Sequence, residues 1–183
     1  MKKLALSVAA AIGALALLGV AQPAAAALKK GAAAPMFDTT GALAGKAFRF
    51  DLHEALKKGP VVLYFYPKAF TQGCTLEANA FAEAMDDFRA AGASVVGMSN
   101  DDIETLKRFS TEACRDEFAV ARATPGLIRA YDVALNRPGM GSEMTNRTSY
   151  VIAPNGRVVM VHSDLDWREH VARTLAAVRA LKK

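Results

Sequence analysis

The sequence of 183 residues contains two cysteines, Cys74 and Cys114, and this scarcity excludes several classes of protein. Two cysteines are too few for a disulfide-held scaffold, and their separation rules out the Cys-x-x-Cys motif of a disulfide reductase. The chain also lacks a G-x-S-x-G motif, which argues against a serine hydrolase. Its three histidines, His53, His162 and His170, lack the spacing of metal ligands, so we expect no metal site and no cofactor.

Clustered charge is also missing. The 23 Lys and Arg residues exceed the 18 Asp and Glu residues by five, and the basic residues are scattered along the chain. Proteins that bind nucleic acid concentrate such residues on one face. We therefore expect no nucleic-acid partner.

Acidic residues are absent from the first 27 positions, which differ in composition from the rest of the chain. Lys2 and Lys3 precede an apolar run over 4–20 and a small-residue stretch with A-x-A cleavage sites. We interpret 1–27 as a secretory signal peptide and 28–183 as one domain. An uncleaved anchor is the alternative, because the apolar run approaches the length that spans a bilayer. The expected product is exported, for example to the periplasm, without stable membrane association after cleavage.

Hydrophobic patterns after the leader predict an α/β fold. Apolar runs at 61–66 and 94–98 indicate strands that are buried on both faces. Helical spacing predicts a helix over 75–91 that Gly92 closes, and Asp101 with Glu104 indicates a capping box for the next helix. Further expected elements are an N-terminal extended or hairpin segment in 31–48, a strand at 118–122, a short helix at 125–131, a strand hairpin over 147–162 and a final helix over 166–181. This order predicts a three-layer α/β domain with a central mixed sheet.

Cys74 stands where the first buried strand gives way to a helix. At such a junction, unpaired N–H groups and the positive end of the helix dipole favour a thiolate over a thiol. A lone cysteine is more often a small core residue. Its sequence context decides between these two interpretations.

The spacing Pro67-x-x-x-Thr71-x-x-Cys74 resembles the active-site motif of the peroxiredoxins. The longer string from Tyr66 to Thr75 resembles the branch called peroxiredoxin Q or bacterioferritin comigratory protein. This resemblance implies a thioredoxin-like fold and a thiol-dependent peroxidase that reduces hydrogen peroxide and organic hydroperoxides. It also implies a peroxide substrate, a thioredoxin-like or other thiol reductant, and a monomer.

The resemblance also implies a role for each motif residue. Cys74 is the attacking, or peroxidatic, cysteine, and Thr71 points its hydroxyl at the sulfur or at the peroxide oxygen. Pro67 shields the pocket from water, and Arg147 stabilises the thiolate and polarises the O–O bond. Glu77 is a candidate for orienting this arginine, although a glutamate in a first helical turn is also what any helix favours.

The product at Cys74 would be a sulfenic acid, which condenses with a second thiol. Much of the resembled branch carries that thiol five residues later, where this chain has Asn79, so Cys114 is the candidate resolving cysteine. We expect the polar segment 110–116 to be weakly anchored, so that it can unwind and form a disulfide. A one-cysteine mechanism, with an external thiol acting directly on Cys74, remains open.

A non-enzymatic alternative uses the same residues. A periplasmic redox sensor or binding protein with this fold would be oxidised once and would not turn over.

Overall fold

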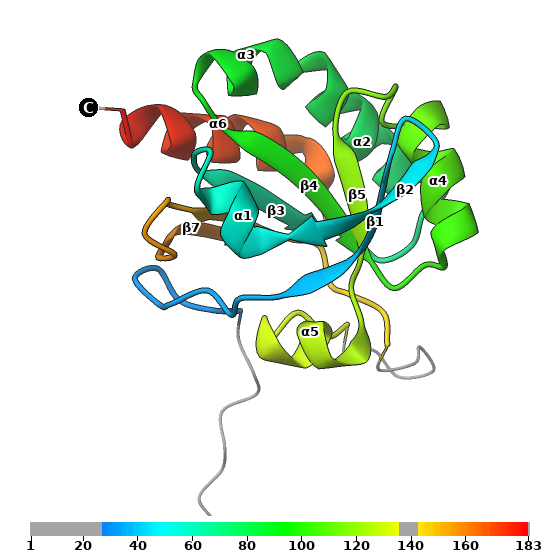
Figure 1. Ribbon diagram of the computed structural model, residues 1–183, viewed down its shortest axis with the longest axis horizontal. Coiled ribbons are helices and arrows are strands. Elements are labelled where there is room, and N and C mark those ends of the chain that lie inside the picture. The colour runs from blue at the N-terminus through cyan, green and yellow to red at the C-terminus, as the bar shows by residue number, and fades with distance from the viewer. Residues whose placement is uncertain (1–26, 136–142, 183) are drawn as a thin grey trace, which may run out of the picture.

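Seven strands form one mixed β-sheet in residues 27–135 and 143–182, the part of the chain that this computed structural model describes (Figure 1). The strand order is β2-β1-β5-β4-β3-β6-β7. Strands β3, β4 and β5 run parallel, and all other neighbours pair antiparallel. The strands are β1 (Asp38–Leu43), β2 (Lys46–Asp51), β3 (Val61–Phe65), β4 (Ser94–Ser99), β5 (Ala119–Arg122), β6 (Thr148–Ile152) and β7 (Val158–Ser163).

Helices cover both faces of this sheet (Figure 1). Helices α2, α3, α4 and α6 pack on one face, and α1 and α5 pack on the other. The strand β3 is fully buried. Its Val62 and Tyr64 belong to the core beneath α2, α3, α4 and α6, while its Leu63 and Phe65 belong to the core beneath α1 and α5. The helices are α1 (Leu52–Leu56), α2 (Gln72–Glu83), α3 (Met85–Ala90), α4 (Ile103–Glu112), α5 (Pro125–Ala130) and α6 (His170–Ala180), and the 3-10 turn η1 (Trp167–Glu169) precedes α6. The predicted three-layer α/β architecture is confirmed.

The predicted helix over 75–91 differs most from the structure. It begins earlier, at Gln72, and it is two helices that meet at Ala84. Phe81 of α2 and Phe88 of α3 both enter the same core. Gly92 ends the second helix with φ +74°, as predicted, because this left-handed conformation favours glycine.

Two smaller features were not foreseen. The short helix α1 follows β2, and the predicted capping residue of α4 is wrong by one position. Asp102 caps α4, since its side chain accepts a hydrogen bond from the backbone N–H of Thr105. The neighbouring Asp101 is thereby free for another contact, described below.

Within residues 27–135 and 143–182, no helix combines the length and the apolar character needed to cross a membrane. The predicted signal peptide lies outside the described residues, apart from Ala27.

Candidate active site

Cys74 lies in the first turn of α2, directly after the loop that follows β3. Thr71 is the N-cap of this helix, and the backbone N–H of Thr75 donates to its carbonyl over 2.9 Å. Cys74 is reduced and 1% exposed. Its sulfur is therefore withdrawn from bulk water at the helix end where backbone N–H groups and the dipole favour negative charge.

Arg147, the residue directly before β6, extends its side chain to this sulfur. Its Nη2 donates to Cys74 Sγ over 3.5 Å, and its Nη1 donates to Glu77 Oε2. Its Nε donates to the carbonyl oxygen of Leu165 over 2.8 Å. Since Arg147 is 5% exposed, these three contacts fix a buried guanidinium beside the thiol. The structure thus brings Arg147 and Glu77, two residues singled out in the sequence, to Cys74.

Glu77 lies one helical turn after Cys74 and is fully buried. Burial raises the pKa of Glu77 to about 8, although the charge and hydrogen bond of Arg147 lower it. A buried carboxyl group resists ionisation because the charged form loses its hydration.

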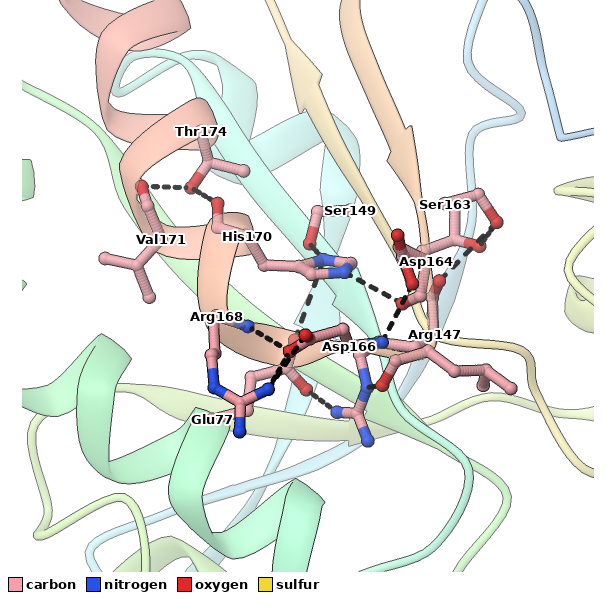
Figure 2. A network of polar contacts seen from close by, with 12 residues as sticks. Glu77, Arg147, Ser149, Ser163, Asp164, Asp166, Arg168, His170, Val171 and Thr174 are labelled. Atoms are coloured by element: carbon pink, nitrogen blue, oxygen red, sulfur yellow. Dashed lines mark hydrogen bonds and ion pairs between the residues drawn. The ribbon is translucent and has the colours of Figure 1, made fainter.

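A second polar layer lies behind Glu77 (Figure 2). His170, the first residue of α6, lies 2.7 Å from Ser149 Oγ through Nδ1 and 3.0 Å from the Asp164 carbonyl oxygen through Nε2. His170 is fully buried, and burial lowers its pKa to about 4. The ring is therefore neutral near neutral pH.

The loop before α2 is tied to the end of β4 by Asp101. Its Oδ2 accepts from the backbone N–H of Ala69 over 2.8 Å and from the Ser99 hydroxyl over 2.7 Å. Aspartate side chains commonly fix turns in this way, by accepting hydrogen bonds from nearby backbone N–H groups. Asp101 thus sets the position of the segment that leads to Cys74.

Phe70 shapes the same loop. It has φ +62°, a left-handed conformation that costs a non-glycine residue about 1–3 kcal/mol. Its ring, 39% exposed, lies edge-on to Phe109 at 5.2 Å, and the guanidinium of Arg108 lies 5.0 Å from its centroid. These contacts with α4 hold the strained residue in place.

Thr71 does not make the contact that its motif position suggests. Its hydroxyl donates to the Lys68 carbonyl oxygen over 3.0 Å instead of pointing a hydrogen at the sulfur. The hydroxyl oxygen keeps lone pairs that can accept from a bound hydroperoxide. Pro67 is half-buried and lines a surface hollow together with Phe70 and Asp101.

Cys114 lies two residues after the end of α4 and is fully buried and reduced. The expectation that segment 110–116 is weakly anchored is wrong for Ser110, Ala113 and Cys114, which are buried, whereas Glu112, Arg115 and Asp116 are exposed. Burial raises the pKa of the Cys114 thiol far above its usual range. Arg115 and Asp116, which follow it, have φ values of +52° and +60°. The turn is thus well packed but strained in its backbone.

Sequence reasoning missed Ser149, His170 and the anchoring contact of Asp101. The sequence pattern marked His170 only as a histidine without metal-ligand spacing. Its contact with α2 depends on how the last helix packs across the sheet, and no local pattern in the sequence indicates this.

The fold and this site together define a class: thiol enzymes in which a buried cysteine at a helix N-terminus lies beside a fixed arginine. Comparison with known proteins specifies it further. The model of the AhpC/TSA family matches residues 30–161, so the chain belongs to this family, the peroxiredoxins.

Relatives place the chain in the Bcp and peroxiredoxin Q branch. Peroxiredoxin Bcp of Xanthomonas campestris is 31% identical over 67% of this chain and 78% of its own length. Chloroplastic peroxiredoxin Q of Oryza sativa is 32% identical over 84% of this chain and 68% of its own length. The crystal structure of peroxidoxin BcpB from Mycobacterium tuberculosis superposes with a TM-score of 0.76 at 29% identity, covering 85% of this chain and 99% of that one. The thioredoxin-like fold and a thiol-dependent peroxidase activity follow from this membership.

Proposed function

We propose that this peroxiredoxin reduces hydrogen peroxide and organic hydroperoxides through the Cys74 thiolate. The main observation in support of this proposal is the 3.5 Å contact between Arg147 Nη2 and Cys74 Sγ in a buried site at the start of α2. A fixed cation at this distance stabilises a thiolate without any reorganisation when the reaction begins.

In the first step, the thiolate attacks the terminal oxygen of the hydroperoxide. A sulfur–oxygen bond forms, the O–O bond breaks, and the leaving alkoxide or hydroxide takes up a proton to become alcohol or water. Cys74 is oxidised to a sulfenic acid, and the peroxide is reduced. Arg147 stabilises the negative charge as it moves from the sulfur to the departing oxygen. Thr71 accepts a hydrogen bond from the hydroperoxide O–H. Pro67 limits access of water to the loop.

Cys114 is the proposed resolving residue. Its thiol condenses with the sulfenic acid, so that a disulfide and one water molecule form. A buried thiol with a raised pKa is a poor nucleophile, so the turn after α4 has to open first. The two left-handed residues after Cys114 favour opening at this point. A thioredoxin-like or other thiol reductant then restores both cysteines.

Thiol titration tests the chemistry. Reduced wild type treated with one equivalent of peroxide should lose two thiols, Cys114→Ala should lose one, and Cys74→Ser should consume no peroxide. Peroxide consumption by Cys74→Ser at the wild-type rate would refute the central role of Cys74. Loss of one thiol from wild type would favour the one-cysteine mechanism. Sustained peroxide turnover with a reductant distinguishes an enzyme from a redox sensor, which would be oxidised once. The similarity to peroxiredoxins does not favour the sensor.

The proposal includes export. Residues 1–27 act as a signal peptide, and residues 28–183 work outside the cytoplasm as a monomer. The composition of the leader supports this proposal. When the full chain is expressed in a Gram-negative host, intact mass should show a shortened chain in the periplasmic fraction, and light scattering should show one chain per particle. A full-length chain in the membrane fraction would overturn the proposed cleavage.

A further inference from the structure

The two oxygens of the buried Glu77 carboxyl group differ in their hydrogen-bond partners. Oε2 accepts from Arg147, whereas Oε1 is buried and has no hydrogen-bond partner among the residues that the structure describes. A buried carboxylate oxygen without a partner is costly when it carries negative charge. The ring of His170 lies near this oxygen, with 3.7 Å between its Nδ1 and Oε1.

The contacts of His170 determine which ring nitrogen carries hydrogen. Nε2 faces the carbonyl oxygen of Asp164 at 3.0 Å, and a carbonyl oxygen accepts only, so Nε2 carries the hydrogen of the neutral ring. Nδ1 is then without hydrogen and accepts from the Ser149 hydroxyl at 2.7 Å. Figure 2 shows this ring at the start of α6 above the Glu77 carboxylate.

With Glu77 ionised, an imidazole lone pair would face a carboxylate lone pair in a fully buried space. A proton on Glu77 removes this repulsion. The proton stays on Glu77, because the one lone pair of Nδ1 already accepts from the Ser149 hydroxyl and Oε1 lies 3.7 Å away, beyond hydrogen-bond distance. The pair then carries no net charge.

We propose that His170 is a positioning residue that keeps Glu77 protonated in the reduced enzyme by holding a hydrogen-free Nδ1 beside its carboxyl group, leaving the whole charge of Arg147 to the Cys74 thiolate. This inference rests on the proposed function of Cys74 and deepens it. An ionised Glu77 would neutralise the same guanidinium and compete with the thiolate for it. The Glu77–His170 pair therefore controls how strongly Arg147 stabilises the thiolate.

The surrounding charges fit this assignment. Arg147 contacts Glu77, and burial together with nearby groups that include Glu77 raises the pKa of Tyr64 on β3, so its hydroxyl is neutral. On the other side, the His162 ring of β7 lies 4.5 Å from the His170 ring, and the carboxylates of Asp164 and Asp166 are exposed. Burial raises the pKa of Glu77 to about 8 and lowers that of His170 to about 4, which puts the proton on Glu77.

A double-mutant cycle tests the pair in the full chain carrying Cys114→Ala, in which Cys74 is the one remaining thiol. The first measurement is the pH midpoint for alkylation of Cys74 by iodoacetamide, which requires no peroxide. His170→Asn places an amide near the position of Nδ1, where it can donate to Glu77 and stabilise the ionised form. We expect this variant to raise the midpoint by about one pH unit. In a Glu77→Gln background, where there is no carboxylate to ionise, the same change should have no effect on the midpoint.

The second measurement is the pH profile of the rate constant with peroxide. In the protein that retains His170, this rate constant should fall as pH rises through about 8, because Glu77 then loses its proton. The Glu77→Gln variant should lack this fall. His162→Asn is the matched control, because it alters the ring that packs on His170 and leaves the Glu77 contact in place, and it should shift neither measurement. Circular dichroism identifies any variant that fails to fold, and the cycle then uses His170→Gln.

An equal shift by His170→Asn in both backgrounds would overturn the proposal, because the histidine would then act independently of Glu77. An alkaline fall that persists in Glu77→Gln would also overturn it. Failure of the peroxidase proposal looks different: Cys74→Ser would keep peroxide consumption, while the alkylation cycle would still report on the pair.

Discussion

Gly73 is the residue at which catalysis and stability should separate most clearly. A Cβ atom added at Gly73 would lie 3.3 Å from Arg147 Nη2 and 4.0 Å from Trp167 Cδ1. Arg147 has little freedom to yield, because it is held by Glu77 and by the carbonyl oxygen of Leu165. The Gly73→Ala substitution should therefore push Nη2 away from the Cys74 sulfur by a few tenths of an ångström.

The magnitude follows from the contact that weakens. A hydrogen bond to a charged group contributes about 1.5–3 kcal/mol, and partial loss of about 1.4 kcal/mol lowers a rate tenfold. We expect the rate constant with peroxide to fall about tenfold. Stability should stay within about 1 kcal/mol of wild type, because alanine favours a helix over glycine by up to about 1 kcal/mol and offsets the tight contact.

Stopped-flow kinetics with peroxide and urea unfolding measure the two effects. Gly126→Ala is the matched control, since Gly126 is also helical and its added Cβ would meet nothing closer than Thr124 Oγ1 at 3.8 Å. The control should keep the wild-type rate. If Gly73→Ala kept the wild-type rate while Arg147→Lys lost it, the argument that Gly73 makes room for the guanidinium would be refuted.

Three further predictions follow from the same site. Arg147→Lys keeps a positive charge but loses the planar fork that joins Cys74, Glu77 and the backbone, so the rate constant with peroxide should fall about 100-fold, and an unchanged rate would contradict this role. Asp101→Ala leaves the Ala69 N–H without its partner, so hydrogen exchange at that amide should accelerate about tenfold or more, whereas unchanged protection would show that Asp101 does not hold the loop. The free energy of unfolding should fall as pH rises from about 6.5 to about 8, because the folded state raises the pKa of Glu77 and binds a proton that the unfolded chain has already lost. His170 contributes the opposite slope, since its pKa is lowered, but only below about pH 6.5. Urea unfolding across this range should show the decline in wild type and not in Glu77→Gln.

The order of elements was predictable because it depends on local patterns. The run 61–66 is apolar throughout, and the structure buries β3 completely on both faces. Gly92 occupies the left-handed position where a helix ends. The break at Ala84 was not predictable, since the apolar spacing continues through it and Phe81 and Phe88 would share one face of an unbroken helix as well.

The sequence by itself indicated the proposed reactive residue. Cys74 follows a buried strand and begins a helix, and with Pro67, Thr71 and Arg147 it marks the peroxiredoxin family. These features are encoded in short segments or in a motif, so they can be read without coordinates.

The tertiary structure alone decided what surrounds that residue. It buries Cys114 in a packed turn, assigns Asp101 to the active-site loop, and brings His170 of the last helix against Glu77 of the second. Glu77 and His170 are separated by more than ninety positions in the chain. Their proximity arises because two helices share one face of the sheet, and the chemistry of the buried pair follows from its removal from water.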